Sequence, residues 1–397
     1  MKRPILFRRK KEEPQRQEQA ELQPREKIIL DESGMVDLPF LLLTILLVVI
    51  GIIMMFSASY ASAYVEKGNS THFFARQGLF ALLGIGIMLF VSRVPYHWWR
   101  AFYFVILLGT LFILLLVPII GTEENGAKRW INIFGISFQP SEVAKFTLIL
   151  SYATIISASK DKMKTFRGMI PCLVILGSIV LLVALEKHLS AIIILGFVAA
   201  AMMFLGGVRW YWFAAGIAVA ALGLYLYITF MGYASSRLIA WRDPWSDPGA
   251  AGYQIIQSLY AIGSGGLMGQ GLGRSRQKYL YLPEEHNDYI FPIVCEELGF
   301  VGAMVIILLF VLLIIRGYWI AIHAKDRFGA LLAAGVTTLF ALQVFFNIGV
   351  VTNFLPATGI SLPFFSYGVT ALLAQLFEVG VVLSVSRQST NQLMSFK

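Results

Sequence analysis

Long apolar runs separated by short polar segments dominate this chain. A helix that crosses the hydrocarbon core of a bilayer needs about 20 mainly apolar residues, and ten segments meet this requirement. The predicted spans are residues 38–58, 73–92, 101–120, 141–157, 169–186, 190–206, 212–231, 289–315, 328–350 and 366–386. Only residues 186–189 separate the fifth and sixth, so a re-entrant hairpin is an alternative to two full spans there. The predicted fold is all-α, a ten-helix transmembrane bundle.

The overall composition excludes an ordinary soluble protein. Hydrophobic residues make up 57% of the chain and charged residues 14%, with a mean hydropathy of +0.72. A soluble protein of this size needs far more polar surface to cover its core. The first long apolar run starts near Asp37 without a cleavage signal before it, so we expect the first helix to stay in the membrane.

The net charge of +9 is unevenly distributed between the two predicted faces of the membrane. Of the 32 Lys and Arg residues, 21 fall in the N-terminal tail, the even-numbered loops and the C-terminal end, and nine fall on the opposite side. Such an excess is typical of the cytoplasmic face. Both termini are therefore predicted to be cytoplasmic, and the charge needs no nucleic-acid partner.

Three regions follow from this pattern. We expect a disordered cytoplasmic tail over residues 1–35, a membrane domain over 36–388, and a short cytoplasmic tail over 389–397. The largest extracellular segment is the loop 232–288 between the seventh and eighth spans, which should contain helices of its own, including an amphipathic one at 253–262 on the membrane surface. Cys172 and Cys295 lie in spans near opposite faces, so no disulfide is expected.

Charged residues inside the predicted spans are the first candidates for chemistry. Arg76 lies one turn into the second span, and Glu142 and Lys145 are spaced i, i+3 at the start of the fourth. Charges in a membrane are costly and are usually paired or functional. They indicate either a structural ion pair with an Arg reaching the interface, or a polar cavity that opens outward. The two interpretations are compatible.

Asp288 is the last polar residue before the long apolar run of the eighth span. A carboxylate at this boundary suits a catalytic base at the mouth of a cavity, and a helix-capping Asp is the competing interpretation. Glu296 and Glu297 lie two turns deeper in the same helix. Together with His286 they make a metal site conceivable, but the spacing matches no dedicated ligand set, so no metal site is predicted.

Glycine-rich and broken loops surround these residues. The run from Gly263 to Gly273 lacks the strand and helix of a dinucleotide fold. It indicates either backbone amides that bind phosphate or a tight return of the loop to the membrane surface. Asn347, Gly359 and the segment 362–368 form another broken outer loop, which we interpret as packing and cavity lining.

Several short motifs stand in one order along the chain and together resemble a known family. They are Gly126-Ala-Lys-Arg-Trp-Ile131, Gln139-Pro-Ser-Glu-x-x-Lys145, Trp241-Arg-Asp-Pro244, Gly252-Tyr-Gln254, Gln257-Ser258, Gly265-Gly-Leu-x-Gly-x-Gly-Leu-Gly273, Leu282-Pro-Glu-x-His-x-Asp288, Glu296-Glu-Leu-Gly299 and Leu362-Pro-Phe-x-Ser-Tyr-Gly368. Over about residues 36–386 the chain resembles the SEDS family of bacterial peptidoglycan polymerases, which includes FtsW, RodA and SpoVE. The segment Glu186-Lys-His-Leu-Ser190 is closer to the FtsW/SpoVE branch than to RodA-like members.

The resemblance implies an enzyme of the bacterial cytoplasmic membrane that polymerises lipid II into β-1,4 glycan strands at the outer face, in cell division or spore cortex synthesis. The essential acid of the family maps onto Asp288, and a Glu and a Lys of its fourth span map onto Glu142 and Lys145. The full set of substrate-binding candidates is Arg76, Lys128, Arg129, Glu142, Lys145, His286 and Ser366.

The same resemblance suggests partners and a reaction. The implied partners are a class B penicillin-binding protein acting as transpeptidase, and other divisome or sporulation membrane proteins. Asp288 would take a proton from the acceptor hydroxyl, a role that typically contributes ~10²- to 10⁴-fold. The basic candidates, or a divalent cation such as Mg²⁺ or Mn²⁺, would neutralise the leaving pyrophosphate, with no organic cofactor. A lipid II flippase or other polyprenyl-lipid transporter is the alternative, and a division scaffold without chemistry is a third possibility.

Overall fold

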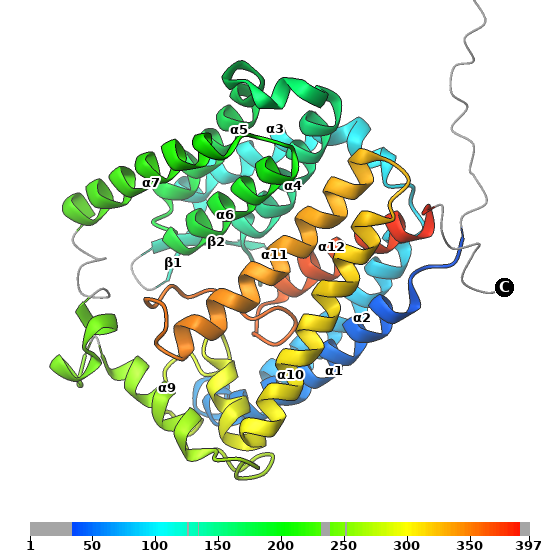
Figure 1. The fold of residues 1–397 in the computed structure, drawn as a ribbon. Helices are drawn as coiled ribbons and strands as arrows, with labels where there is room; N and C mark the ends of the chain where they lie inside the picture. The colour runs from blue at the N-terminus through cyan, green and yellow to red at the C-terminus, as the bar shows by residue number, and fades with distance from the viewer. Residues whose placement is uncertain (1–33, 125–126, 134, 232–238, 251, 390–397) are drawn as a thin grey trace, which may run out of the picture. The chain divides into compact units, whose positions relative to one another are not determined.

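A computed structural model describes residues 34–389 except 125–126, 134, 232–238 and 251 (Figure 1). The tails expected at 1–35 and 389–397 lie almost wholly outside this part of the chain. A helix occupies each of the ten predicted spans. These helices are α1 (Leu38–Lys67), α2 (His72–Val91), α3 (His97–Ile120), α4 (Pro140–Ser159), α5 (Phe166–Leu185), α6 (Leu189–Leu205), α7 (Trp210–Met231), α10 (Ile290–Ile322), α11 (Arg327–Val351) and α12 (Val369–Arg387). The all-α prediction is confirmed.

Length and hydropathy alone identify seven of the described helices as long and apolar enough to cross a membrane. The other three predicted spans, α4, α6 and α7, fall below that threshold. Helix α6 has 17 residues, and α4 carries Glu142 and Lys145 in its first two turns. Because almost every residue of α4 is buried, other helices rather than lipid surround it.

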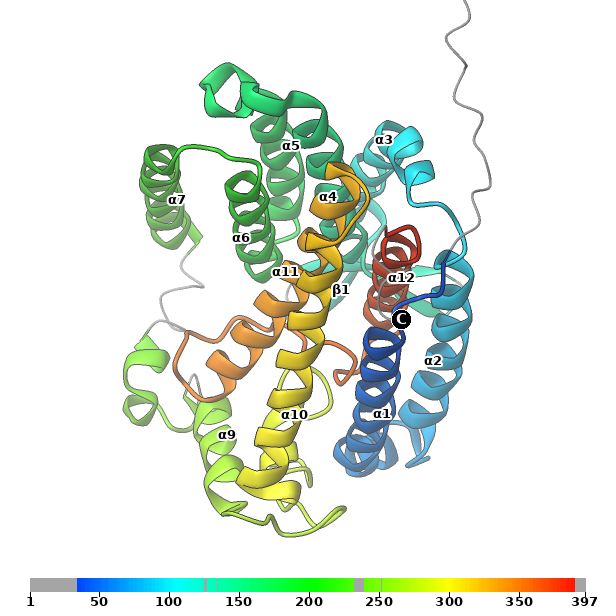
Figure 2. The ribbon, with the colours of Figure 1, turned by 45° about the vertical axis from the view of Figure 1, so that its right-hand side comes forward.

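The centre of the bundle is built by α4, α11 and α12. Helix α11 packs on α10, α4 and α6, and α12 packs mainly on α2, while α1 lies against α10 and α2 (Figures 1 and 2). In α11 and α12, 78% of the most apolar stretch is buried inside the protein. Helices α5 and α6 are two separate, contacting helices joined by the turn 186–188.

A small sheet between α3 and α4 was not predicted. Strands β1 (Thr122–Glu124), β2 (Ala127–Ile133) and β3 (Ile136–Phe138) form an antiparallel sheet in the order β1-β2-β3. The alternation in Trp130-Ile-Asn-Ile133 is the signal that favours a strand. Gly135, with a φ of 79°, makes the turn into β3 possible without a steric penalty.

The long loop between α7 and α10 contains helices, as expected. Where the structure describes it, the loop holds a 3₁₀ turn, η2 (Pro244–Ser246), and the amphipathic helix α9 (Tyr253–Ser264). Helix α9 packs on α10 and buries Ile255 and Ile256, and the Ser258 hydroxyl donates to the Val351 carbonyl at 2.7 Å. Its position on a membrane surface stays a prediction. Cys172 and Cys295 are both buried and unbridged, as predicted.

Candidate active site

Asp288 lies at the end of the long loop, two residues before α10 begins at Ile290. The N-cap position of α10 belongs to Tyr289, whose side chain makes no capping hydrogen bond, so the interpretation of Asp288 as the N-cap residue is wrong. The half-buried Asp288 instead lines a small cavity of about 70 Å³. The lining residues are Ala240, Gln254, Ile255, Asp288, Tyr289, Ala357 and Gly359.

The main chain of Asp288 is held by α11. The Asn347 side-chain amide donates to the carbonyls of Asp288 and Ile360, each at 2.7 Å. One Asn thereby ties the start of α10 to the loop that precedes α12. Because Asn347 is 1% exposed, water cannot easily compete for these bonds.

Gly359 leaves room beside the Asp288 carboxylate. A Cβ built on Gly359 would lie 3.3 Å from Asp288 Oδ2 and 4.0 Å from Ser190 Oγ. Asp288 and Ser190 therefore both lie close to the same glycine. The Ser190 hydroxyl donates to the neighbouring Thr358 carbonyl. The expected cavity-lining role of Gly359 is confirmed, whereas the proximity of Ser190 was not predicted.

A second polar cluster forms where α4 begins. The Lys145 ammonium lies 2.7 Å from Glu142 Oε2, and both residues are buried. This confirms the structural ion pair. Ser141, the residue before Glu142, has its hydroxyl 3.2 Å from His188 Nδ1 in the turn between α5 and α6. Lys145 also acts electrostatically on Glu378 of α12, which is 2% exposed.

Burial controls the charge of the turn between α5 and α6. It lowers the pKa of His188 to about 3, with the positive charges of Arg129 and Lys145 acting in the same direction. Burial raises the pKa of Glu186 to about 8, against the opposing effect of Arg129. Among the described residues, neither Glu186 carboxyl oxygen has a hydrogen-bond partner. Both groups are therefore mainly neutral at pH 7.

Two of the basic candidates, Arg76 and Arg129, are held by backbone carbonyls. Arg76 of α2 donates to the Gly135 carbonyl at 2.5 Å, and Arg129 of β2 donates to the Lys187 carbonyl at 2.6 Å. Lys128 is exposed on β2. A carbonyl positions a guanidinium without cancelling its charge. The structure thus brings Arg129 close to the cluster around His188, while the substrate-binding roles stay predictions.

His286 and Ser366 are buried in the loops that precede α10 and α12, respectively. The His286 ring stacks on Phe73 with centroids 4.8 Å apart, and its Nδ1 lies 3.4 Å from Glu285 Oε1. The Ser366 hydroxyl accepts from the Leu362 amide at 2.8 Å. These contacts give both side chains a packing role. Their contact with substrate stays a prediction.

The glycine run is hydrogen-bonded to α10. The amides of Gln270 and Gly271 donate to the carbonyls of Glu296 and Glu297 at 2.9 and 3.0 Å. The Gly269 amide donates to the Gly265 carbonyl at 2.8 Å. These three amides are therefore already used within the protein, and phosphate binding by the run stays a prediction.

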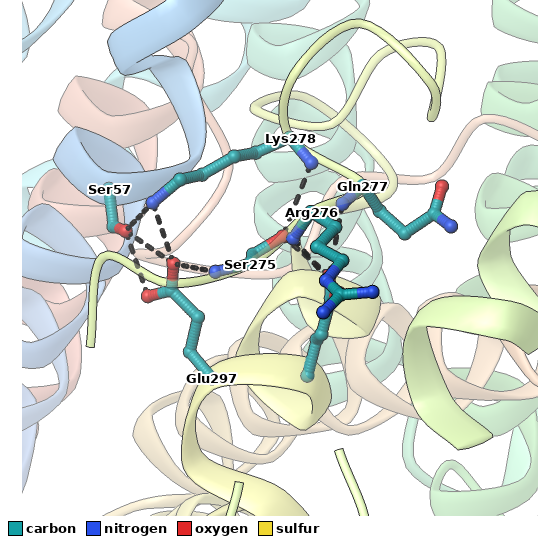
Figure 3. A network of polar contacts seen from close by, with 7 residues as sticks. Ser57, Ser275, Arg276, Gln277, Lys278 and Glu297 are labelled. Atoms are coloured by element: carbon teal, nitrogen blue, oxygen red, sulfur yellow. Dashed lines mark hydrogen bonds and ion pairs between the residues drawn. The ribbon is translucent and has the colours of Figure 1, made fainter. Parts of the chain in front are cut away.

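Glu296 and Glu297 bind other segments of the protein. Glu296 accepts from the Arg276 amide. Glu297 binds Lys278 of the long loop and Ser57 of α1 (Figure 3). In the part of the chain that the structure describes, no three His, Cys, Asp or Glu side chains converge to hold a metal ion. A divalent cation would therefore depend on substrate phosphate oxygens as further ligands.

The comparisons with known proteins agree with one another. The family model described as cell cycle protein, FtsW/RodA/SpoVE, matches residues 37–391. The chain is 43% identical over 354 residues to the probable peptidoglycan glycosyltransferase FtsW of Geobacter sulfurreducens, covering 88% of this chain and 95% of that protein. It is 40% identical over 356 residues to stage V sporulation protein E of Bacillus subtilis, covering 89% and 97%.

Two solved structures share the fold. A chain of a peptidoglycan synthase complex that coordinates polymerization and crosslinking superposes with a TM-score of 0.74 at 26% identity, over 89% of this chain and 98% of that chain. The rod shape determining protein RodA of Thermus thermophilus superposes with a TM-score of 0.67 at 24% identity, over the same shares. The second match supports the architecture alone.

Proposed function

The chain belongs to the FtsW/RodA/SpoVE family, and from this premise we propose that it is a peptidoglycan glycosyltransferase that polymerises lipid II into β-1,4 glycan strands. The observation that carries the mechanism is the half-buried Asp288 carboxylate lining a cavity at the start of α10. Among the cavity-lining residues, it is the only carboxylate. A role in cell division or in spore cortex synthesis follows from the FtsW and SpoVE relatives.

The reaction needs one proton acceptor near the acceptor sugar. The 4-hydroxyl oxygen of the acceptor attacks the anomeric carbon of the donor, and its proton passes to the Asp288 carboxylate. The bond from the anomeric carbon to the pyrophosphate oxygen breaks, and the electron pair leaves with the pyrophosphate. A single displacement converts an α-linked donor into a β-linked product, so no covalent enzyme intermediate is required.

The leaving pyrophosphate needs positive charge close to it. Arg129 and Lys145 are the best-placed basic candidates because both act electrostatically on His188, whose turn continues into Ser190 beside Asp288. Glu142 holds Lys145 in place through the ion pair. Arg76 and Lys128 are further candidates, and a divalent cation such as Mg²⁺ or Mn²⁺ would supply positive charge there if one were bound.

Orientation and partners complete the proposal. The excess of Lys and Arg on one side supports cytoplasmic termini and an outward-facing Asp288. The similar chain in a peptidoglycan synthase complex supports a transpeptidase partner, which we assign to a class B penicillin-binding protein. Other divisome or sporulation membrane proteins are proposed as additional partners.

Polymerisation of labelled lipid II by the purified chain, with and without the transpeptidase, tests the proposal. Wild type should make glycan strands, whereas Asp288→Asn should fold and bind its partner but polymerise at least ~100-fold more slowly. Asp247→Asn, which changes an exposed carboxylate of the same loop, is the matched control and should keep the wild-type rate.

The competing function gives a different result in the same samples. A lipid II flippase or other polyprenyl-lipid transporter would move labelled lipid II across vesicle membranes without forming polymer. A scaffold would do neither. Near-normal polymer from Asp288→Asn would remove this residue as the base while leaving the glycosyltransferase activity in place.

A further inference from the structure

Lys278 and Glu297 form a buried ion pair that the mechanism above does not use. Lys278 Nζ lies 2.9 Å from Glu297 Oε1, and their side chains are 3% and 0% exposed. The Ser57 hydroxyl of α1 donates to the Glu297 carboxylate at 2.7 Å and accepts from Lys278 Nζ at 3.1 Å. Figure 3 shows the three side chains pointing toward one another from α1, α10 and the long loop. With so little exposure, neither charge can contact substrate.

The neighbouring glutamate binds the backbone of the same loop segment. Glu296 accepts hydrogen bonds from the amides of Arg276 and Gln277 at 3.0 and 3.3 Å and from the Ser275 hydroxyl. Glu297 accepts from the Ser275 amide at 3.3 Å. Two adjacent carboxylates of α10 therefore hold residues 275–278 in one conformation, and the charge on each strengthens these bonds.

A second set of bonds holds the loop immediately before this segment. The amides of Phe300 and Val301 donate to the carbonyls of Gly266 and Leu267 at 2.9 and 3.1 Å. These bonds are possible because α10 is interrupted at Gly299, which has a φ of 70°. The loop is thus attached to α10 at Glu296 and Glu297 and again about one turn later, at Phe300 and Val301.

Asp288 lies midway in the chain segment that this ion pair closes. It follows Lys278 by ten residues and precedes Glu297 by nine. Within the segment, the Leu282 amide donates to the Gln277 carbonyl at 3.0 Å, and the Tyr289 amide donates to the Glu284 carbonyl at 3.2 Å. These hydrogen bonds close turns over residues 277–282 and 284–289, so the chain between Lys278 and Asp288 is folded rather than extended.

We propose that Lys278 and Glu297 are positioning residues, which set the place of the Asp288 carboxylate by closing the segment 278–297 against Ser57 of α1. This inference rests on the proposed glycosyltransferase function. Two apolar surfaces can shift past one another at little cost. A buried ion pair that shares a hydroxyl keeps its hydrogen bonds in only one arrangement of the loop against α10 and α1. Misplacement of a catalytic group by about 1 Å costs on the order of 10²-fold in rate.

The test compares the kcat and KM for lipid II polymerisation of four variants in the full-length chain with its transpeptidase. Lys278→Met and Glu297→Gln should each lower kcat by about 10- to 100-fold, with KM within about 2-fold of wild type. The kcat of the double variant should fall by less than the product of the two single-variant factors, because the double variant leaves no unpaired charge buried. Lys278→Arg, which keeps the charge, should recover part of kcat.

Two measurements separate positioning from loss of the fold. Rates are taken well below the midpoint of thermal unfolding of each variant, and hydrogen exchange is followed over residues 279–289, where Lys278→Met should exchange faster. Arg276→Met is the control, since it removes an exposed cation of the same turn and should keep the wild-type kcat. If Lys278→Met does not fold, Ser57→Ala replaces it, with an expected kcat loss of about 3- to 10-fold at unchanged KM.

The outcomes are distinguishable. An unchanged kcat in folded Lys278→Met, or in Ser57→Ala if that variant is used, overturns the inference while wild-type polymerisation upholds the proposed function. A raised KM with normal kcat also overturns it, because it would indicate a role in substrate binding. Absence of polymer from wild type with its partner would contradict the proposed function itself.

Discussion

Glu186 shows how burial changes the charge of a single side chain in this protein. It lies in the turn between α5 and α6, outside both helices, and is 1% exposed. Its pKa is raised to about 8, so the folded protein holds a proton that the unfolded chain, with the ordinary glutamate pKa of 4.5, has released at neutral pH. Folding stability is therefore greatest below the unfolded pKa and falls as the pH rises through the folded pKa.

Glu186→Gln should remove this dependence. Between pH 6 and pH 9, we expect the free energy of unfolding of wild type to fall by about 2 to 3 kcal/mol more than that of Glu186→Gln. Unfolding followed in mixed detergent micelles at the two pH values measures the difference. Glu66→Gln, which changes an exposed carboxyl at the end of α1, should parallel wild type. Equal pH trends for wild type and Glu186→Gln would show that Glu186 is ionised in the folded state.

Helix α10 is the element that connects the loop to the site. It carries Glu296 and Glu297, begins beside Asp288 and is interrupted at Gly299. A Cβ on Gly299 would lie 2.2 Å from the Gly269 nitrogen, so the close approach of loop and helix depends on this glycine. The positive φ of 70° excludes most other residues for a second reason.

Gly299→Ala should therefore be strongly destabilising. The expected loss is about 2 kcal/mol or more in the free energy of unfolding, because the backbone must either accept strain or separate from the loop. Gly177→Ala in α5 is the control, since its Cβ would meet nothing within 4 Å and should be neutral or slightly stabilising. Thermal unfolding of both variants in detergent checks the prediction, and equal midpoints would contradict it.

The protein as a whole separates into a tail and a membrane unit. The described residues from 35 to 389 form one compact unit, and every described site residue belongs to it. The N-terminal residues are rich in charge and contain no apolar stripe. The described residues that we assign to polymerisation thus lie outside the N-terminal tail.

Removal of residues 1–30 should leave the rate of lipid II polymerisation within about 2-fold of wild type, since every described site residue lies outside the deleted segment. The rate is measured on purified enzyme, so that any effect of the tail on membrane insertion does not enter the comparison. Asp37→Ala in the full chain is the comparison, because it breaks a 2.7 Å ion pair with Arg316 and the cap on the Phe40 amide. Asp37→Ala should lower the stability of the protein. A large loss of polymerisation rate on removal of the tail would contradict the prediction and assign the tail a role in activity.

Local rules predicted the helices well. Each helix starts within four residues of its predicted span, because hydropathy and helix length are properties of consecutive residues. The Glu142–Lys145 pair also follows from spacing along one helix. Strands β1 and β3 escaped prediction because runs of three residues carry little periodic signal, and the alternation near the end of β2 covers only a few residues.

The polar network and the surroundings of Asp288 depend on contacts between distant parts of the chain. Ser57 meets Glu297 across 240 residues of sequence, and Ser190 meets the Thr358 carbonyl across 168. Hydropathy places each of these residues near a membrane boundary, but it does not say which helices become neighbours. The family motifs pointed to Asp288 without its surroundings. The cavity, the neutral Glu186 and the closed segment 278–297 arise from how the helices pack.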